Sequence, residues 1–491
     1  MSAPLPLLYS FRGAALMVGL IGAWRLMILA GADLNLSFDE AQYWVWSQSL
    51  EFGYFSKPPF VAWVIALTTG LFGEGETAIK LGALLANLGV SLTLYVLARR
   101  LYGEREGFWA AVVFATLPAV SLSSMVVSVD PFLLLFWGLA LVCLHKALEE
   151  EDRLAWWVGL GLALGFGLLA KYAMGFFLLG FLVFTIWSPE RIVLWRHKGT
   201  WLALGVAAAI IAPNVAWNAA HGFITFAHTK ANANLGGSLF HPDKGLEFIG
   251  GQFAVFGPLL FATLAWLILR TRREVKGERE KFLLSFILPV LLPMVVQAFL
   301  SRANPNWAAP IYVAATVLVV GWLVAKGRWW VIRVSVILHL ALAAAVYNIE
   351  TLAPLAGVEL TAKTDLLKRT RGWDQVAAGV EAFVRENPEA KLLFDARKVM
   401  APLLYYIHPH PLDAAMWNQD VVPTNHFEMF MDIKDRVGES FLLITEEPNA
   451  NHIAPWFESV EQLDRLRVTM YARPEDDLNI RIFRAVNFKG Y

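Results

Sequence analysis

Apolar residues gather in long runs along the first 350 residues of the chain. A helix that crosses a membrane needs about 20 mostly apolar residues. The run at residues 59–73 is too short for this and predicts a helix lying in the membrane interface. The remaining pattern predicts a polytopic α-helical membrane protein with about eleven spans, at residues 9–31, 78–98, 107–127, 131–148, 154–170, 172–188, 200–217, 247–269, 282–300, 307–325 and 329–348.

After residue 350 the texture changes, because residues 351–491 have ordinary polarity and contain no run of span length. Residues 373–385 repeat their apolar positions at helical spacing. Three short apolar segments are typical of strands, at residues 391–395, 441–445 and 479–485. The sequence therefore predicts two domains, a transmembrane domain over residues 1–350 and a small α/β domain over residues 351–491.

Composition agrees with this division. Hydrophobic residues make up 57% of the chain and charged residues only 17%, against about a quarter charged in soluble domains. The formal net charge is zero, so charge gives no reason to expect a nucleic-acid partner. Cys143 is the only cysteine, which excludes an intrachain disulfide. No small-residue cleavage site follows the first apolar run, which favours a retained span over a signal peptide.

Lysine and arginine in the loops predict the orientation, because such residues concentrate in cytoplasmic loops. With a cytoplasmic N-terminus, the inside loops hold seventeen of them and the outside loops six. Counting residues 59–73 as a span would reverse this asymmetry. The eleven-span scheme therefore places the loop at residues 218–246 and the C-terminal domain outside the cytoplasm, and residues 270–281 inside.

The outside loops contain the acidic side chains that could do chemistry. Asp39 and Glu40 begin the first of these loops, and Tyr43 lies one helical turn beyond Asp39. Asp130 stands before a proline at the outer ends of two predicted spans. Both places also suit a simpler role, because acids and the preceding Ser37 are favoured in the first turn of a helix.

Three cations are predicted on the same side. Lys57 precedes a Pro-Pro pair that restricts the backbone, Lys171 lies in a short turn between two spans, and Arg302 opens a loop. A lysine at a span end can also simply reach the interface with its charge. Acids and cations together suit the displacement of a lipid phosphate from a sugar, which needs a base and a positive charge for the departing phosphate. The chain has no nucleotide-binding fingerprint.

The segment at residues 38–63, FDEAQYWVWSQSLEFGYFSKPPFVAW, resembles the first periplasmic loop of bacterial glycosyltransferase family 39. This family belongs to the GT-C superfamily and includes protein mannosyltransferases and the lipid A aminoarabinose and galacturonic acid transferases. The resemblance covers roughly residues 10–325. Weaker supporting segments are residues 129–131 (VDP), 170–172 (AKY), 252–261 (QFAVFGPLLF) and 304–312 (NPNWAAPIY).

The resemblance implies that Asp39 is the catalytic carboxylate with Glu40 beside it, that Asp130 is the second acid, and that Lys57 contacts the phosphate. Tyr43, Tyr172, Lys171 and Arg302 are further candidates for substrate binding. The sequence departs from the aminoarabinose transferases at Ser56, where they have a glutamate, and this weakens the transfer of a metal site. No metal is assigned. Asp39 and Asp130 could hold a divalent cation, and the other metal candidates are His221, His228, His241, His408 and His410.

The expected function is a glycosyltransferase of the bacterial inner membrane, acting on the periplasmic side. It would move one sugar from a polyprenyl phosphate to a lipid, glycan or protein acceptor, with inversion of the anomeric carbon. In that scheme Asp39 is the base, and Lys57, with Lys171 or Arg302, balances the phosphate. Two alternatives stay open: a transporter or flippase of lipid-linked sugars, and a non-catalytic family member that binds lipid. No paired halves of the kind common in transporters are evident.

Overall fold

The computed structural model describes residues 7–32, 34–234, 239–274, 277–471 and 473–491. It divides into two compact units, neither of which is continuous in the sequence. The first unit comprises Met1–Ala30, Lys57–Val64 and Lys80–Tyr347, and the second comprises Gly31–Ser56, Ile65–Ile79 and Asn348–Tyr491. The second unit thus combines the C-terminal part of the chain with most of the first predicted outside loop.

The first unit is helical, and its apolar runs form the predicted helices. Six helices are long and apolar enough to cross a membrane, or up to seven if one bent pair counts as a span, and four more apolar helices among the described residues are shorter. The fold class is therefore as predicted, and the chain is a multi-pass membrane protein, whereas the count of eleven spans is not confirmed. Five of the six are α1 (Phe11–Gly31), α4 (Glu76–Leu101), α7 (Asp130–Glu149), α10 (Lys198–Ala220) and α18 (Trp329–Tyr347), and the sixth is the segment Glu278–Leu300, which comprises α15 and α16.

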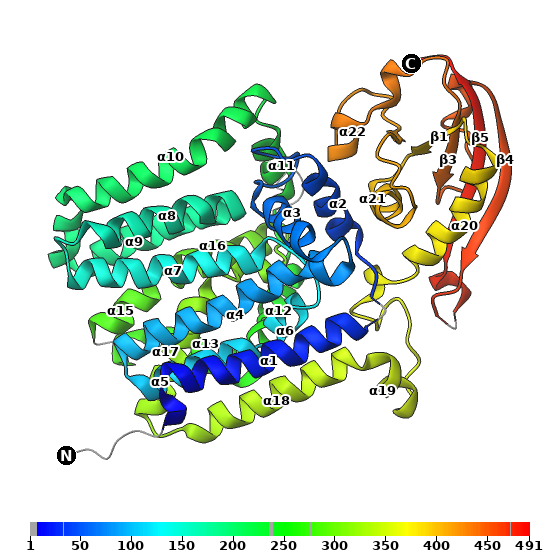
Figure 1. Ribbon diagram of the computed structural model, residues 1–491. Helices are drawn as coiled ribbons and strands as arrows, with labels where there is room; N and C mark the ends of the chain where they lie inside the picture. Colours follow the sequence, from blue (N-terminus) through cyan, green and yellow to red (C-terminus); the bar gives the residue numbers. More distant parts are fainter. Residues whose placement is uncertain (1–6, 33, 235–238, 275–276, 472) are drawn as a thin grey trace. The chain divides into compact units, whose positions relative to one another are not determined.

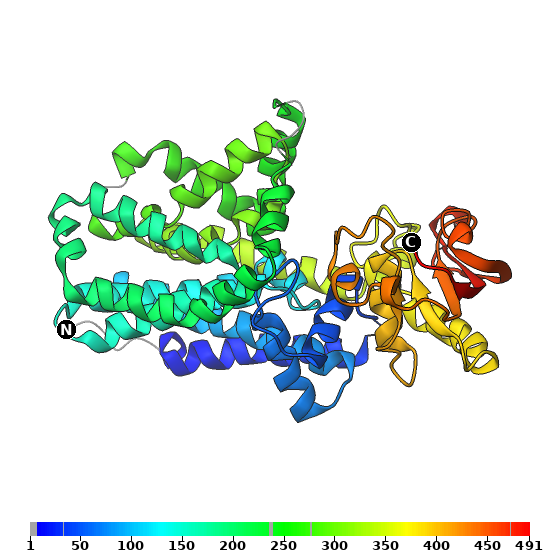
Figure 2. The same cartoon turned by 90° about the horizontal axis from the view of Figure 1, so that it is seen from above.

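Shorter helices complete this unit. Helix α8 lies between α7 and α10, and α5 packs against α17 and α18 (Figure 1). In the view from above, the long helices again run side by side (Figure 2). Their bounds are α5 (Glu104–Thr116), α6 (Pro118–Ser123), α8 (Leu154–Ala170), α9 (Phe176–Trp187), α11 (Ile224–Asn232), α12 (Pro242–Phe256), α13 (Pro258–Leu269), α14 (Thr271–Glu274), α15 (Glu278–Ser285), α16 (Leu288–Leu300) and α17 (Ile311–Ala325), with short 3-10 turns η1 (Leu7–Tyr9), η2 (Tyr172–Gly175), η3 (Pro189–Arg196) and η4 (Pro305–Ala308).

Two of the predicted spans, at residues 107–127 and 247–269, are interrupted helices and not single continuous ones. Helices α12 and α13 meet at a bend of 120°. Gly257 at the bend has a φ of 86°, a backbone region that glycine adopts most readily, and Pro258 starts the next helix. The other break, between α5 and α6, comes directly before Pro118, because proline disfavours the helical conformation of the preceding residue.

A buried arginine donates hydrogen bonds to polar groups on both sides of the break between α5 and α6. Arg25 of α1 is fully buried, and its Nη2 donates to the carbonyl oxygen of Ala115 at 2.6 Å and to the hydroxyl of Ser121 at 2.8 Å. Its Nη1 donates to the hydroxyl of Ser124 at 3.3 Å. A charge at this depth needs such polar partners. Arg25 therefore stabilises the interrupted helix.

The second unit contains a five-stranded sheet with strand order β2-β1-β3-β5-β4. Strands β1, β2 and β3 are parallel, and β5 pairs antiparallel with both β3 and β4. Helices α20 and α21 pack on each other, α20 against β4 and α21 against β1 (Figure 1). The bounds are β1 (Lys391–Phe394), β2 (Ala415–Met416), β3 (Phe441–Thr445), β4 (Phe457–Val468), β5 (Leu478–Phe488), α2 (Phe38–Gln48), α19 (Ile349–Leu355), α20 (Trp373–Glu386), α21 (Arg397–Tyr406) and α22 (His426–Phe430), with 3-10 turns η5 (Lys368–Thr370), η6 (Ile433–Asp435), η7 (Ala454–Trp456) and η8 (Pro474–Asp476).

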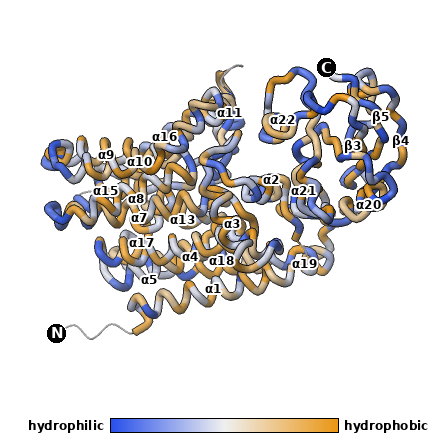
Figure 3. The backbone as a smooth tube through the Cα atoms, turned by 45° about the horizontal axis from the view of Figure 1, so that its top comes forward, coloured by the Kyte–Doolittle hydropathy of each residue, from blue (hydrophilic) through white to orange (hydrophobic). Residues whose placement is uncertain are grey.

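The predicted helix at residues 373–385 and all three predicted strands are present. The sequence did not reveal β4, whose exposed edge position allows many charged residues. The predicted interfacial helix is α3 (Phe60–Phe72), an apolar helix of 13 residues. Figure 3 shows apolar residues along most helices of the first unit with hydrophilic residues at their connecting turns, and a more hydrophilic chain along β4 and β5.

Candidate active site

Helix α2 begins with a capping box that separates its two acids. The Ser37 hydroxyl accepts from the amide of Glu40 at 3.5 Å, and the Glu40 carboxylate accepts from the amide of Ser37 at 2.9 Å. Glu40 is therefore turned back into the protein and is only 1% exposed. The predicted capping role is confirmed for Ser37 and Glu40. Asp39 takes no part in the box, and its side chain is 44% exposed.

A residue from the C-terminal part of the chain donates a hydrogen bond to the Asp39 carboxylate. Nη1 of Arg397, the first residue of α21, donates to Oδ1 of Asp39 at 2.9 Å and to Oε1 of Gln42 at 2.8 Å. The Arg397 guanidinium also lies 4.8 Å from the centre of the Phe38 ring. Among the described residues, Oδ2 of Asp39 has no hydrogen-bond partner. One oxygen is thus fixed while the other is available to a ligand.

The other face of α2 forms part of a core. Tyr43 and Trp46 are buried, with ring centres 5.1 Å apart. Trp46 stacks on Tyr54 at 4.5 Å, and both lie against the ring of His426. Burial raises the pKa of Tyr54 to about 12 and lowers the pKa of His426 to about 3. Tyr43, a predicted substrate contact, therefore lies in the packed side of the helix.

The first unit holds the second acid. Asp130 begins α7 and Lys171 follows α8, and their Oδ1 and Nζ atoms are 2.6 Å apart. Oδ2 of Asp130 accepts from Nδ2 of Asn306, in η4, at 2.8 Å. The side chains of Asp130 and Lys171 are 14% and 23% exposed. Two predicted site residues are thus brought together, and both carboxylate oxygens of Asp130 have a partner.

Tyr172 belongs to a separate network beside this pair. Its hydroxyl donates to Oδ1 of Asn214 at 2.8 Å and accepts from Nδ2 of Asn218 at 3.1 Å. Its ring stacks on Phe226 at 4.7 Å. The hydroxyl is therefore engaged by α10, and the ring by α11.

The remaining predicted cations are in different settings. Lys57 is partly buried and stands between Ser56 and the Pro-Pro pair that precedes α3. Arg302 follows α16 and is exposed, and its guanidinium makes no ion pair with a described residue. Lys57 belongs to the first unit and Asp39 to the second.

The sequence did not reveal the roles of Asn306 and Arg397. Asn306 lies within the segment at residues 304–312 that supported the family resemblance, so the motif was a usable signal. Arg397 follows a strand at a position where no local pattern marks it. Arg397 reaches α2 only through the folding of the second unit, which contains both α2 and α21.

The candidate metal ligands do not gather. Nδ1 of His221 lies 2.7 Å from the carbonyl oxygen of Trp217, and its ring stacks on that tryptophan at 4.0 Å. His408 and His410 have ring centres 4.7 Å apart, and Nε2 of His410 lies 3.4 Å from Glu74. Within the described ranges, no group of three His, Cys, Asp or Glu is arranged to hold a metal ion. These residues therefore give no basis for assigning one.

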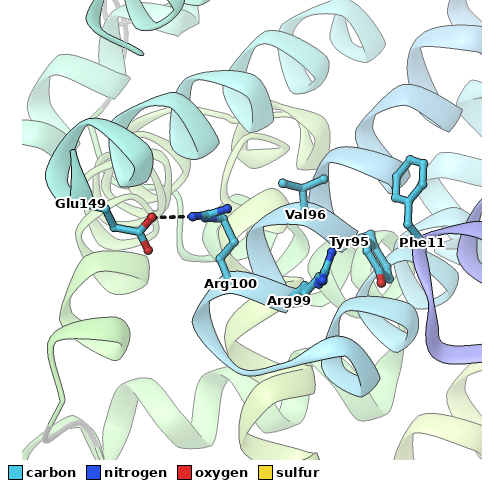
Figure 4. A pocket seen from close by; sticks show the side chains of 6 residues that line it. All are labelled: Phe11, Tyr95, Val96, Arg99, Arg100 and Glu149. Atoms are coloured by element: carbon cyan, nitrogen blue, oxygen red, sulfur yellow. Dashed lines mark hydrogen bonds and ion pairs between the residues drawn. The ribbon is translucent and has the colours of Figure 1, made fainter. Parts of the chain in front are cut away.

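A cavity of about 390 Å³ lies at the other end of α7 from Asp130 (Figure 4). It is lined by Phe11, Tyr95, Val96, Arg99, Arg100 and Glu149. Arg100 pairs with Glu149 at 2.5 Å. Arg99 pairs with Glu104 at 3.0 Å. The charged side chains that line the cavity are thus paired, and none of the predicted site residues lines it.

Comparison with known proteins identifies the fold and the family. Residues 56–217 match the family described as dolichyl-phosphate-mannose-protein mannosyltransferase. The lipid A galacturonosyltransferase RgtD of Rhizobium johnstonii is 33% identical over 383 residues, which cover 78% of this chain and 80% of that protein. The undecaprenyl phosphate-alpha-4-amino-4-deoxy-L-arabinose arabinosyl transferase of Pseudomonas aeruginosa is 32% identical over 174 residues, 34% of this chain and 31% of that protein.

A solved structure has the same fold across nearly the whole chain. ArnT from Cupriavidus metallidurans, bound to undecaprenyl phosphate, superposes with a TM-score of 0.62 at 16% identity, covering 96% of this chain and 99% of that one. The apo form gives a TM-score of 0.60. The long match to a named sugar transferase supports an enzyme and not the transporter alternative. The chain belongs to glycosyltransferase family 39 of the GT-C superfamily and is a membrane glycosyltransferase.

Proposed function

We propose that this enzyme transfers a galacturonic acid residue from a polyprenyl phosphate to lipid A. The donor class is supported by the relatives, since the arabinosyl transferase is named for undecaprenyl phosphate and the ArnT structure holds that lipid. The sugar and the acceptor are supported by the long match to a lipid A galacturonosyltransferase. The arabinosyl transferases match over a much shorter part of the chain, so they favour aminoarabinose less.

The observation that carries the proposed mechanism is the half-exposed carboxylate of Asp39, with one oxygen held and the other open. In a single displacement, the acceptor hydroxyl oxygen attacks the anomeric carbon and its proton passes to Asp39. The bond from that carbon to the phosphate oxygen breaks, and the lipid phosphate leaves with the electron pair. Attack from the face opposite the phosphate inverts the anomeric carbon. Asp39 thus acts as the general base.

The departing phosphate needs positive charge. We assign this part to Lys57, which stands in a restricted Lys-Pro-Pro setting, and to Arg302, whose guanidinium is exposed. Lys171 is the weaker candidate, because its ammonium group is already paired with Asp130. Asp130 and Asn306 then position Lys171.

The reaction is tested with the purified full-length protein in detergent, where transport across a membrane has no meaning. Labelled polyprenyl-phosphate galacturonic acid is incubated with lipid A, and the product is analysed by mass spectrometry and by NMR of the anomeric proton. The expected result is one galacturonic acid added to lipid A with inverted anomeric configuration. Transfer of aminoarabinose in preference to galacturonic acid would correct the sugar, and retention of configuration would refute the single displacement.

We further propose that the active site and residues 351–491 face the periplasm, because the loop charges favour this orientation. The native Cys143 is the only cysteine, so Cys143→Ser gives a cysteine-free background. The exposed positions Lys434 and Arg273 then carry single cysteines. An impermeant thiol reagent applied to spheroplasts should label Lys434→Cys and spare Arg273→Cys. The reverse pattern would invert the topology.

A further inference from the structure

Arg397 connects the C-terminal α/β structure to the carboxylate on which the proposed mechanism depends. It follows β1 closely, begins α21, and reaches α2, all within the second unit. Its Nη1 atom donates to both Asp39 and Gln42, at 2.9 and 2.8 Å. These two acceptors stand three residues apart and therefore share one face of α2.

This arrangement fixes the orientation of the Asp39 carboxylate. Oδ1 is directed at Arg397, which sets the rotation of the carboxylate and leaves Oδ2 on its other side. The guanidinium also lies over the ring of Phe38, whose centre is 4.8 Å from Arg397 and 5.3 Å from Arg369. Nε and Nη2 of Arg397 form no hydrogen bond with the described residues. Among the described residues, the hydrogen bonds of the Arg397 guanidinium therefore go only to Asp39 and Gln42.

A purely structural role for Arg397 is poorly supported, because other contacts already fasten α2 to α21. The amide of Leu36 donates to the hydroxyl of Tyr406 at 2.6 Å. The ring of Trp44, which is fully buried, lies 5.0 Å from that of Tyr405. The Arg397 and Asp39 side chains are 31% and 44% exposed, and pairs so exposed contribute little to stability.

We propose that Arg397 is a positioning residue of the transferase, which holds Asp39 with one carboxylate oxygen anchored and the other ready to receive the acceptor proton. This inference rests on the proposed role of Asp39 as the base. It gives the C-terminal domain a direct part in catalysis, since residues 351–491 supply a side chain that orients the reactive group. Gln42 is the second support of the same guanidinium.

The test compares Arg397→Ala with Lys398→Ala in the full-length protein. Lys398 is the next residue of α21 and forms an exposed ion pair with Glu446, so it is a matched control. Arg397→Ala should lower kcat about 10–100-fold, as expected when a reacting group is misplaced, with the donor KM changed less than about twofold. Lys398→Ala should keep both constants. The melting temperatures of the two variants should agree within a few degrees.

Two rescues separate positioning from folding. Arg397→Lys keeps a positive charge with a donor and should recover part of kcat, and added guanidinium ion should raise the rate of Arg397→Ala but not that of Lys398→Ala. A wild-type kcat in Arg397→Ala refutes the inference. A loss that guanidinium and lysine both fail to restore, with a lowered melting temperature, refutes it as well. The variant Asp39→Asn separates the failure of this inference from the failure of the proposed function. If Asp39→Asn were fully active, the assignment of Asp39 as the base would be refuted, whatever the result for Arg397.

Discussion

Asp39 and Asp130 are both acids in the first turn of a helix, yet their surroundings differ. Asp130 uses both carboxylate oxygens, one for Lys171 and one for Asn306, and its side chain is 14% exposed. Asp39 uses one oxygen, for Arg397, and its side chain is 44% exposed. Both residues are aspartates in the first turn of a helix, so neither residue type nor helical turn distinguishes their roles.

The difference lies in what each acid can do during a reaction. To accept a proton, Asp130 would have to weaken an ion pair or a hydrogen bond that already satisfies it, and this opposes a base role. Asp39 differs because Oδ2 has no hydrogen-bond partner among the described residues, so a proton can be accepted there while Oδ1 keeps its hydrogen bond from Arg397. The comparison therefore supports the proposal that Asp39 is the base and that Asp130 holds Lys171 and Asn306 in place.

The strongest test of this contrast is Asp39→Asn. Asparagine keeps the size and one acceptor oxygen, so the fold should persist, but it cannot serve as a base. We expect kcat to fall about 10²–10⁴-fold with donor binding and melting temperature nearly unchanged. Steady-state assays with lipid A, together with binding of a polyprenyl phosphate, measure both. An Asp39→Asn enzyme of near-normal rate would remove the base assignment.

The neighbouring acid is the matched control for that variant. Glu40→Gln weakens the capping box, in which the Glu40 carboxylate accepts from the Ser37 amide, and loss of a cap costs about 0.5–2 kcal/mol. The melting temperature should fall while kcat stays within a few-fold of the wild-type value. A larger loss of kcat than in Asp39→Asn would exchange the roles of the two acids.

The next effect concerns the phosphate. Lys57→Ala should raise the KM for the lipid phosphate donor about 10–100-fold, because a hydrogen bond to a charged group contributes about 1.5–3 kcal/mol. Lys230 of α11 is exposed and serves as the control. Lys230→Ala should leave that KM within twofold. Equal and mild changes in the two variants would show that Lys57 only anchors the chain at the interface.

Asp130→Asn should have a smaller effect on turnover and a larger effect on stability. It leaves the partly buried Lys171 without its counter-charge. The cost should lie between the about 0–1 kcal/mol of exposed pairs and the about 3–5 kcal/mol of broken buried pairs. Adding Lys171→Met should recover melting temperature if the pair is structural. If the double variant is no more stable than Asp130→Asn, the pair does not act as a unit.

The sequence predicted the parts of this site that local patterns record. The long apolar runs marked most helices, and the motif at residues 38–63 placed Asp39 at the start of a loop that ends in Lys57 and a Pro-Pro pair. The capping box was readable because Ser37 and Glu40 have the spacing that it requires. The Asp130–Lys171 contact was not predicted, but both residues were named because they lie at span ends.

The rest depended on contacts between distant segments. Arg397 is 358 residues from Asp39 in the chain, and no periodicity connects the two positions. The bend at Gly257 was missed for a different reason, since hydropathy is continuous through residues 247–269 while the backbone turns by 120°. A Gly-Pro pair within an apolar run was the available signal, and hydropathy alone does not read it.

The smallest expected effect is a pH dependence of stability, which arises where His426 packs against α2. The ring centre of His426 lies 5.4 Å from that of Trp46 and 5.8 Å from that of Tyr54, and its buried Nδ1 has no hydrogen-bond partner among the residues that the structure describes. Burial lowers the pKa of His426 to about 3, against about 6.5 when the chain is unfolded. Between these values only the unfolded chain binds the proton. Stability is thus fully present above pH 6.5 and is lost as the pH falls toward 3.

The expected loss between pH 7.5 and pH 5 is about 2 kcal/mol at most. It is measured as the fall in melting temperature of the purified protein across this range, in the wild type and in His426→Phe. Phenylalanine keeps the ring against Trp46 and cannot take up a proton, so the variant should show a smaller fall. His408→Phe, at the exposed surface of the same unit, controls for the substitution itself. If His426→Phe loses as much stability on acidification as the wild type, the pH dependence arises elsewhere, and α2 is held independently of His426.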